Sequence, residues 1–420
     1  MRLHIKNGRV VDPASGRDAL GDVFVAGGKI VDRLEEKADR VIDAAGLVVA
    51  PGFIDLCARL REPGQEHKAT LRSEMDAAVA GGVTSLACPP DTDPPLDEPG
   101  LVDMLRRRAK ALSRARVYPI GALTVKLQGV ALTEMAELAE AGCVAFSQAN
   151  VALADTQVLW RALQYAATFG FPVWLRPEDL WLAKGGVAHD GDIATRMGLP
   201  GIPAFAETIA LGTLLELVRA TGARVHACRL SSAGAVELIR KAKAERLPVT
   251  CDVAIHHVHL CDMDLGYFDP HCRLEPPLRS QRDRNALSRG LAEGVIDCLC
   301  SDHTPVDEDG KQVPFAEAEP GATGLELLLP LALKWGAVHK LSLPQTLARI
   351  TSEPARILGV DSGRLAPGAP GDLAIFDPAA EYLLSAQTLK SQGKNTPFLG
   401  YSLTGRVRYT VVAGNVVFEL

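Results

Sequence analysis

The chain has 420 residues, of which 47% are apolar and 23% are charged, and its formal net charge is −6. This composition is typical of a globular, enzyme-like protein that can form one large domain and a smaller one. The negative charge gives no electrostatic basis for binding nucleic acid or an anionic membrane. No apolar run reaches membrane-spanning length, and the N-terminus lacks the apolar core of a signal peptide, so we expect a cytoplasmic protein.

The two ends of the chain share a pattern of short strands. Residues 1–50 and 356–420 contain alternating apolar runs separated by Gly, Asn-Gly or Gly-Asn turns. This pattern favours antiparallel sheet. Each segment is too short to form a confident domain alone, so we expect one composite β domain built from both termini.

Between the two ends, residues 51–355 alternate between strand-like and helical patterns. Several of the helical stretches end at Gly just before the next strand, as expected for helix C-termini. Such alternation predicts a parallel (β/α)8 barrel. The expected strands begin with residues 48–56 and continue with 82–89, 116–123, 143–148, 171–177, 223–232, 248–257 and 295–303.

Nine cysteines are scattered along the chain, several of them in strand-like runs. In a reducing cytoplasm such residues are most often small buried side chains rather than disulfides. Cys298 and Cys300 form a C-x-C pair on one expected strand, for which we favour packing over metal binding. The remaining cysteines are Cys57, Cys88, Cys143, Cys228, Cys251, Cys261 and Cys272.

Several motifs recur over nearly the whole chain: PGFIDL and LREPGQEHK near the start, GGVTSLACPPDTDPP, MGLPGIP, SSAGAVELIRKAK, EPPLR, SDHTP and GATGLE. Together they resemble the amidohydrolase superfamily and, within it, the dihydroorotases of pyrimidine synthesis. The resemblance implies a TIM-type barrel, a small β-sandwich domain, and a site at the C-terminal ends of the barrel strands.

Active members of that family use a zinc centre to activate water at the ring amide of dihydroorotate. Zinc needs neutral imidazoles and carboxylates as ligands. The family has His-x-His after the first strand, an acid or a carboxylated Lys after the fourth, and a His after each of the fifth and sixth. At the matching positions this chain has Cys57 and Arg59, Gln148, Arg176 and Arg229, and only the acid after the eighth strand, Asp302, remains.

These replacements argue against a metal. A guanidinium is always protonated and has no lone pair to offer. A divalent ion about 4 Å from one guanidinium would meet roughly 8 kcal/mol of repulsion at an effective dielectric near 20. We therefore expect no metal and no cofactor. Arg59, Arg176 and Arg229 should instead pair with Asp302, Asp55 or Glu178 inside the barrel mouth.

The family's substrate pocket is altered as well. Its carboxylate-binding Arg matches Arg61, but its Asn is replaced by Asp93, which would repel an anion, and a further His is replaced by Val306. Nearby arginines could lower the pKa of Cys57, yet no positioned acid–base partner is evident, so we do not expect a nucleophile.

A second group of candidate ligands follows the seventh strand. His256, His257 and His259, with Cys261 close behind, could bind zinc. Alternation along a strand would send His257 and His259 to one side and His256 to the other. We favour structural roles, although zinc binding by His257, His259 and Cys261 stays open.

Two functions fit these observations. The first is a non-catalytic dihydroorotase-like chain, similar to the inactive homologue that accompanies bacterial aspartate transcarbamoylase, which implies that enzyme as partner and self-pairing into dimers within a larger complex. The second is a working cyclic-amide hydrolase with a remodelled site. The replacements are concentrated at the positions of the family's metal ligands, whereas the turns and helix ends of the barrel are intact. This pattern favours the first function.

Overall fold

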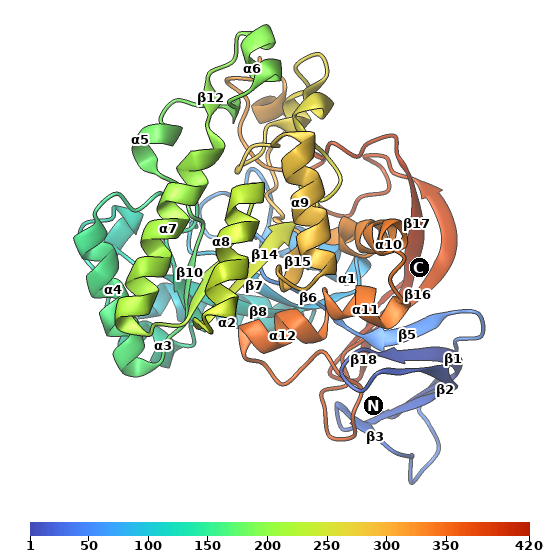
Figure 1. The fold of residues 1–420 in the computed structure, drawn as a ribbon. Coiled ribbons are helices and arrows are strands. Elements are labelled where there is room, and N and C mark those ends of the chain that lie inside the picture. The colour runs from blue at the N-terminus through green and yellow to red at the C-terminus, as the bar shows by residue number, and fades with distance from the viewer.

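Eight parallel strands form the predicted barrel in the computed structural model, which describes residues 1–420 (Figure 1). Neighbours in the barrel follow chain order, as successive strand–helix–strand units require. The strands are β6 (Phe53–Asp55), β7 (Val83–Cys88), β8 (Arg116–Ala122), β9 (Ala145–Ser147), β10 (Val173–Leu175), β13 (Val225–Ala227), β14 (Val249–Ala254) and β15 (Cys298–Cys300).

Helices surround the barrel. Capping residues mark where several of them begin, and glycines mark where several of them end. Thr70 caps the first helix through a capping box with Ser73. Gly170 and Gly222, at φ of 70° and 68°, end two longer helices in the left-handed conformation that glycine adopts without strain. The main helices are α1 (Leu71–Ala80), α2 (Pro99–Leu112), α3 (Met135–Ala141), α4 (Thr156–Phe169), α7 (Ala204–Thr221), α8 (Ala233–Ala244), α9 (Gln281–Ala292), α10 (Leu328–Val338), α11 (Leu343–Ala348) and α12 (Ser352–Leu358).

An insertion between β10 and α7 extends from the end of the barrel opposite the smaller sheet (Figure 1). It consists of α5 (Leu180–Ala183), β11 (Ala188–His189), α6 (Asp192–Met197) and β12 (Gly201–Ile202). The two short strands pair in parallel. This end carries the carboxyl ends of the barrel strands, where sites of such barrels form.

The barrel closes between its first and last strands without a regular ladder. We call the junction of β6 and β15 the seam. Within these two strands, the backbone N–H groups of Ile54 and Leu299 donate to the carbonyls of residues 350 and 349 instead of to each other's strand. At the carboxyl end, the Asp55 carboxylate accepts hydrogen bonds from Ser301, from the backbone N–H at 2.7 Å and from the hydroxyl. The strand extensions then pair directly, because His303 bonds to the backbone of Cys57 and Arg59. The seam therefore joins the segments after β6 and β15.

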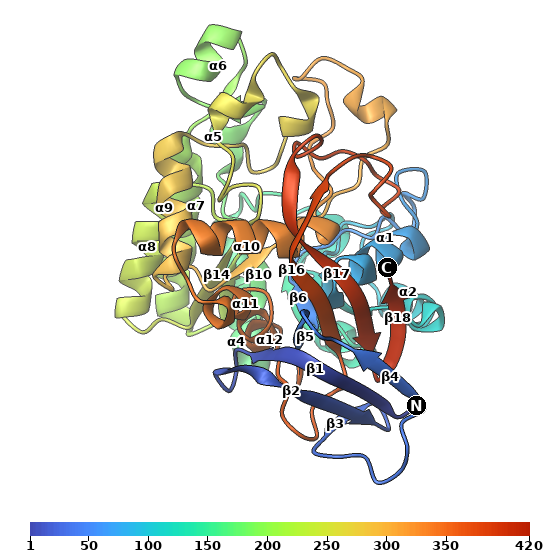
Figure 2. The same ribbon diagram turned by 90° about the vertical axis from the view of Figure 1, so that its right-hand side faces the viewer.

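The second sheet combines both ends of the chain and lies beside the barrel (Figure 2). It is antiparallel for the most part, as predicted, but β1 pairs in parallel with β4 and β5. Residues 48–56, predicted as one strand, are split between β5 in this sheet and β6 in the barrel, with Gly52 between them. The strands are β1 (Leu3–Asp12), β2 (Arg17–Ala26), β3 (Lys29–Val31), β4 (Arg40–Asp43), β5 (Val48–Pro51), β16 (Leu373–Leu383), β17 (Ser402–Val412) and β18 (Asn415–Glu419).

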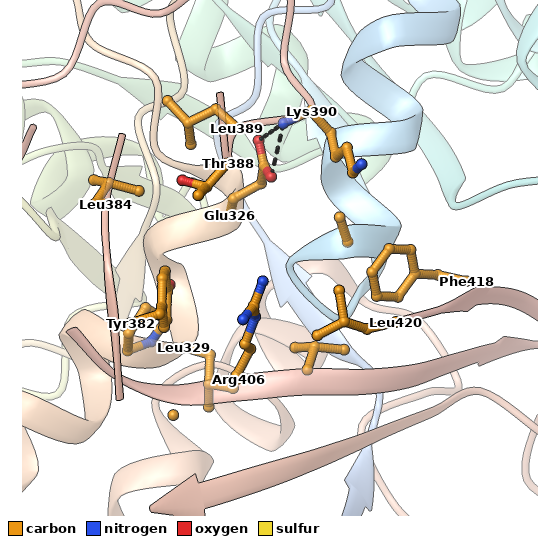
Figure 3. A pocket seen from close by; sticks show the side chains of 14 residues that line it. Glu326, Leu329, Tyr382, Leu384, Thr388, Leu389, Lys390, Arg406, Phe418 and Leu420 are labelled. Atoms are coloured by element: carbon orange, nitrogen blue, oxygen red, sulfur yellow. Dashed lines mark hydrogen bonds between the residues drawn. The ribbon is translucent and has the colours of Figure 1, made fainter. Parts of the chain in front are cut away.

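Polar groups that are buried or half-buried fasten the loop between β16 and β17 to the barrel. Glu326 accepts hydrogen bonds from the backbone N–H of Lys390, drawn as dashed lines in Figure 3, and also from that of Ser391. Glu74 accepts from the Ser391 hydroxyl at 2.6 Å and also bonds to Nε2 of His303. Because His303 belongs to the seam, this loop supports the barrel mouth from outside.

Apolar packing accounts for the cysteines. All nine are free, eight are buried, and Cys228 is half-buried. Cys298 and Cys300 lie with Cys57 in a cluster of small and apolar side chains inside the barrel. No helix in the structure has the length and apolar character needed to span a membrane.

Candidate functional site

The candidate site lies where the segments after β6, β13 and β15 meet. Pairing across the seam places Cys57 and Arg59 beside Asp302, and β13 delivers Arg229 to the same place. Asp302 and Arg229 have φ of 46° and 53°, in the left-handed region. Such backbone conformations are costly for residues with side chains and concentrate at functional sites.

Two arginines converge on one carboxylate oxygen. Oδ1 of Asp302 accepts hydrogen bonds from Nη1 of Arg229 at 2.9 Å and from Nη1 of Arg59 at 3.3 Å. All three side chains are at least nine-tenths buried. Burial opposes ionisation of the carboxyl, but Arg229 and Arg59 together hold the pKa of Asp302 below its usual range. The predicted pairing of these two arginines with Asp302 is present in the structure.

The other donors of Arg59 are satisfied by neighbours that the sequence did not single out. Nε donates to Asp91 at 2.7 Å, Nη2 donates to Asn150 at 3.0 Å, and Nη1 donates to the hydroxyl of Thr304 at 2.9 Å. Asp91 lies two residues before Asp93 in the motif PPDTDPP and was not among the acids expected to pair with an arginine.

Arg176 forms a second ion-pair group next to the first. Its guanidinium pairs with Glu178, as predicted, and also donates to Glu275 at 2.7 Å. The backbone oxygen of Asn150 accepts from Arg176, while the side chain of Asn150 accepts from Arg59, so Asn150 links the two groups. Asp55 was a wrong choice of arginine partner, because Ser301 in the seam uses both of its oxygens.

Gln148 belongs to neither group. Its Oε1 accepts from the hydroxyl of Thr124 at 2.9 Å, and its Nε2 donates to the carbonyl of Leu127 at 3.0 Å. These bonds hold the loop after β8. The structure therefore gives this side chain a loop-ordering role rather than a place in the arginine cluster.

The residues matched to substrate binding do not form a pair. Arg61 donates to the carbonyl of Pro305 at 2.8 Å and to Gln65 at 2.8 Å, so both contacts are internal. Burial, followed by repulsion from Arg59, lowers the pKa of Arg61 to about 10. Asp93 is exposed at the rim, and the buried Val306 donates its backbone N–H to Asn395.

Cys57 is not prepared to act as a nucleophile. Its Sγ lies 3.5 Å from Oδ1 of Asp302 in donor geometry. Burial raises the pKa of this thiol strongly, in spite of the opposing effect of Arg229. The thiolate that nucleophilic chemistry needs is therefore disfavoured.

The donor set at this site does not fit the zinc centre that the resemblance implies. Cys57 is held as a thiol, Asp302 already receives two guanidinium donors, and the neighbouring cations would repel a divalent ion. Elsewhere, His226, Cys228 and Asp252 lie close enough to hold an ion. Both ring nitrogens of His226 are already used, by the hydroxyl of Thr250 at 2.8 Å and by Asp252 at 3.0 Å, so a structural hydrogen-bond chain accounts for this group.

The histidines after β14 lie in a turn, because the strand ends at Ala254, so the prediction that strand alternation sorts them was wrong. His256 and His259 both pack against Phe398, with ring centroids 5.8 and 6.3 Å away. His257 lies 3.1 Å from the carbonyl of Pro276. His257, His259 and Cys261 do not form a group of potential ligands.

Comparisons with known proteins agree with this architecture. The family described as Dihydro-orotase-like matches residues 46–235, and the Amidohydrolase family matches residues 201–417. A "Dihydroorotase-like protein" of Pseudomonas aeruginosa is 45% identical over 100% of both chains, and one of Pseudomonas putida is 44% identical over 99% of both. A "Dihydroorotase" of Geobacter sp. (strain M21) is 41% identical over 100% of both. Among solved structures, the L-hydantoinase of Arthrobacter aurescens matches 99% of this chain and 96% of its own, with a TM-score of 0.87 and 26% identity.

Proposed function

Because the chain belongs to the dihydroorotase-like family of the amidohydrolase superfamily, we propose that it is a catalytically inactive member that serves as a structural partner of aspartate transcarbamoylase in pyrimidine biosynthesis. The observation that carries the proposal is the Arg59–Asp302–Arg229 cluster. It fills the place where the resemblance expects zinc-bound water.

The cluster supports inactivity through its charges and its hydrogen bonds. Hydrolysis of a ring amide needs an activated water and a group to accept its proton. Asp302 is the remaining acid, and its Oδ1 is engaged by two guanidinium groups. A carboxylate stabilised in this way is a poor base, since its low pKa reduces its affinity for a proton.

The rest of the fold supports a role that needs the chain to stay folded. The seam, the buried Glu74–His303 pair and the helix caps are all in place, although they serve no chemistry on their own. If the chain is folded but does not catalyse a reaction, its remaining role is to offer a surface for contact with another protein. We name aspartate transcarbamoylase as the partner because the chain resembles the inactive homologue that accompanies this enzyme in bacteria.

A cleft near the mouth supplies an apolar surface for the proposed self-pairing. Val151, Leu180, Trp181 and Ile209 line it and are 39–71% exposed. Exposed apolar patches on folded proteins mark contact sites, and interfaces between identical chains are the more apolar ones. We assign this patch to contact with a second copy of the chain.

The working-hydrolase alternative rests on the relatives named Dihydroorotase at 41% identity and on the presence of Asp302. Purified protein should show no turnover of dihydroorotate or of its open-chain precursor, with or without added zinc. Elemental analysis should find no stoichiometric zinc. Robust turnover by the unaltered chain would replace our proposal with this alternative.

The partner role is tested by co-expression with aspartate transcarbamoylase, followed by size-exclusion chromatography. We expect the two chains to elute together and the transcarbamoylase to assemble or work better with its partner. If the chains elute separately and the transcarbamoylase is fully assembled and active alone, the partner role is wrong.

A further inference from the structure

A basic groove lies at the end of the barrel opposite the candidate site. It runs between α2 and the C-terminal strands β17 and β18; Figure 2 shows α2 beside β18. The volume of the groove is about 780 Å³. Arg116, at the amino end of β8, forms part of its wall, so the groove opens at the amino ends of the barrel strands. Cavities that hold small molecules have volumes of about 300–1,000 Å³.

The cations of the groove are only partly neutralised. Arg114 pairs with Asp76, and Arg116 pairs with the buried Asp372. The side chain of Lys110 has no ion pair or hydrogen bond. No acid contacts Arg106, whose Nη1 donates to the backbone carbonyl of Ala141 at 2.6 Å.

Arg107, which also lines the groove, has an 81% exposed side chain and contacts only Asp103 one turn away. An exposed pair of this kind contributes little and leaves the guanidinium free to exchange partners. The groove therefore combines a net positive charge with donors that can turn toward a ligand, in a chain whose total charge is −6.

Helix stabilisation explains part of this pattern but not all of it. Cations in the last turn of a helix interact favourably with its C-terminal carbonyl groups. Lys110 lies in the last turn of α2, but Arg106 and Arg107 lie more than a turn before its end at Leu112. Their position along a concave surface calls for a second explanation.

We propose that this groove binds a small molecule that carries several phosphate groups. Guanidinium groups match phosphate oxygens with paired hydrogen bonds, and a lysine adds a point charge. Arg106, Arg107 and Lys110 would make the direct contacts, while Arg114 and Arg116 are held in place by their acidic partners. The site is separate from the arginine cluster at the mouth and does not depend on the proposed partner.

The probe is inorganic triphosphate, with binding measured by titration calorimetry on the full-length protein at low salt. The groove variant combines Arg106→Glu with Lys110→Glu. Its matched control combines Lys241→Glu with Arg282→Glu, which makes the same change of charge at exposed, unpaired sites on α8 and α9. We expect saturable binding that weakens at least about tenfold in the groove variant and stays nearly unchanged in the control.

Parallel titrations with ATP and with adenosine distinguish the source of the phosphates. Equal binding of ATP and triphosphate with no binding of adenosine assigns recognition to the phosphates alone, and tighter binding of ATP adds a nucleoside contact. If the double variant fails to fold, Lys110→Gln alone should still weaken binding. Absence of saturable binding to the native chain, or equal loss in groove variant and control, would overturn the proposal.

Discussion

Nη1 of Arg229 lies 2.9 Å from Oδ1 of Asp302, although the two residues are 73 positions apart and sit at the ends of β13 and β15. Both side chains are buried, so neither can exchange its partner for water. The two residues form a buried ion pair, as the sequence predicted, and this contact joins the ends of the two strands.

Replacing Asp302 should destabilise the protein. Asp302→Ala leaves Arg59 and Arg229 buried without their shared acceptor, and breaking a buried pair typically costs about 3–5 kcal/mol. Chemical denaturation monitored by circular dichroism measures the free energy of unfolding. Asp93→Ala, at an exposed acid of the rim, is the control and should change it little. Equal stability of native protein and Asp302→Ala would rule out the buried network.

Placing histidine at positions 57 and 59 should not produce dihydroorotase activity. In the variant Cys57→His with Arg59→His, Arg176 and Arg229 still place positive charge at the mouth, and Gln148 still faces Thr124. We expect neither dihydroorotase turnover nor stoichiometric zinc, as measured by enzyme assay and elemental analysis. If this variant showed both turnover and stoichiometric zinc, Arg176, Arg229 and Gln148 would not prevent a zinc centre from forming.

The loop between β16 and β17 should make stability depend on pH. Burial raises the pKa of Glu326 from 4.5 to about 7, although the backbone N–H groups of Ser391 and Lys390 oppose the shift. A carboxyl with a raised folded-state pKa binds more protons in the folded than in the unfolded chain between these values. Its contribution to stability is therefore full below pH 4.5 and declines until about pH 7, by at most about 1.4 kcal/mol per pH unit.

Unfolding titrations between these pH values test this dependence. Glu326→Gln should flatten the decline, because the amide does not titrate. Glu140→Gln, at an exposed position on α3, should leave the pH profile as it is in the native protein. Identical profiles for native protein and Glu326→Gln would show that the loop contact does not titrate in this range.

The apolar patch formed by Val151, Leu180, Trp181 and Ile209 should control self-association. Trp181 is 71% exposed, so Trp181→Asp places a charge in the proposed contact without disturbing the core. Light scattering after size-exclusion chromatography should give a dimer mass for native protein and a monomer mass for the variant. Leu20→Asp, at an 80% exposed residue of β2, should remain dimeric. A dimer that survives Trp181→Asp would place the contact elsewhere.

Local patterns in the sequence were sufficient to predict the barrel and much of the arginine network. Alternating strand and helix periods depend on neighbouring residues only, which is why the barrel, the helix ends at glycine and the buried cysteines could be predicted. The pairing of Arg59 and Arg229 with Asp302 could also be expected, since side chains at the carboxyl ends of parallel strands converge.

The remaining features depended on tertiary structure. The contact between Arg59 and Asp302 spans 243 positions and forms because the seam sets the register of β6 against β15. Loop conformation placed Asp91 against Arg59 and turned Gln148 toward Thr124. The sequence by itself determined the elements and the charges at the strand ends. Only the tertiary structure decided which acid meets which guanidinium, because hydrogen-bond partners are chosen over distances of a few ångströms that no sequence spacing specifies.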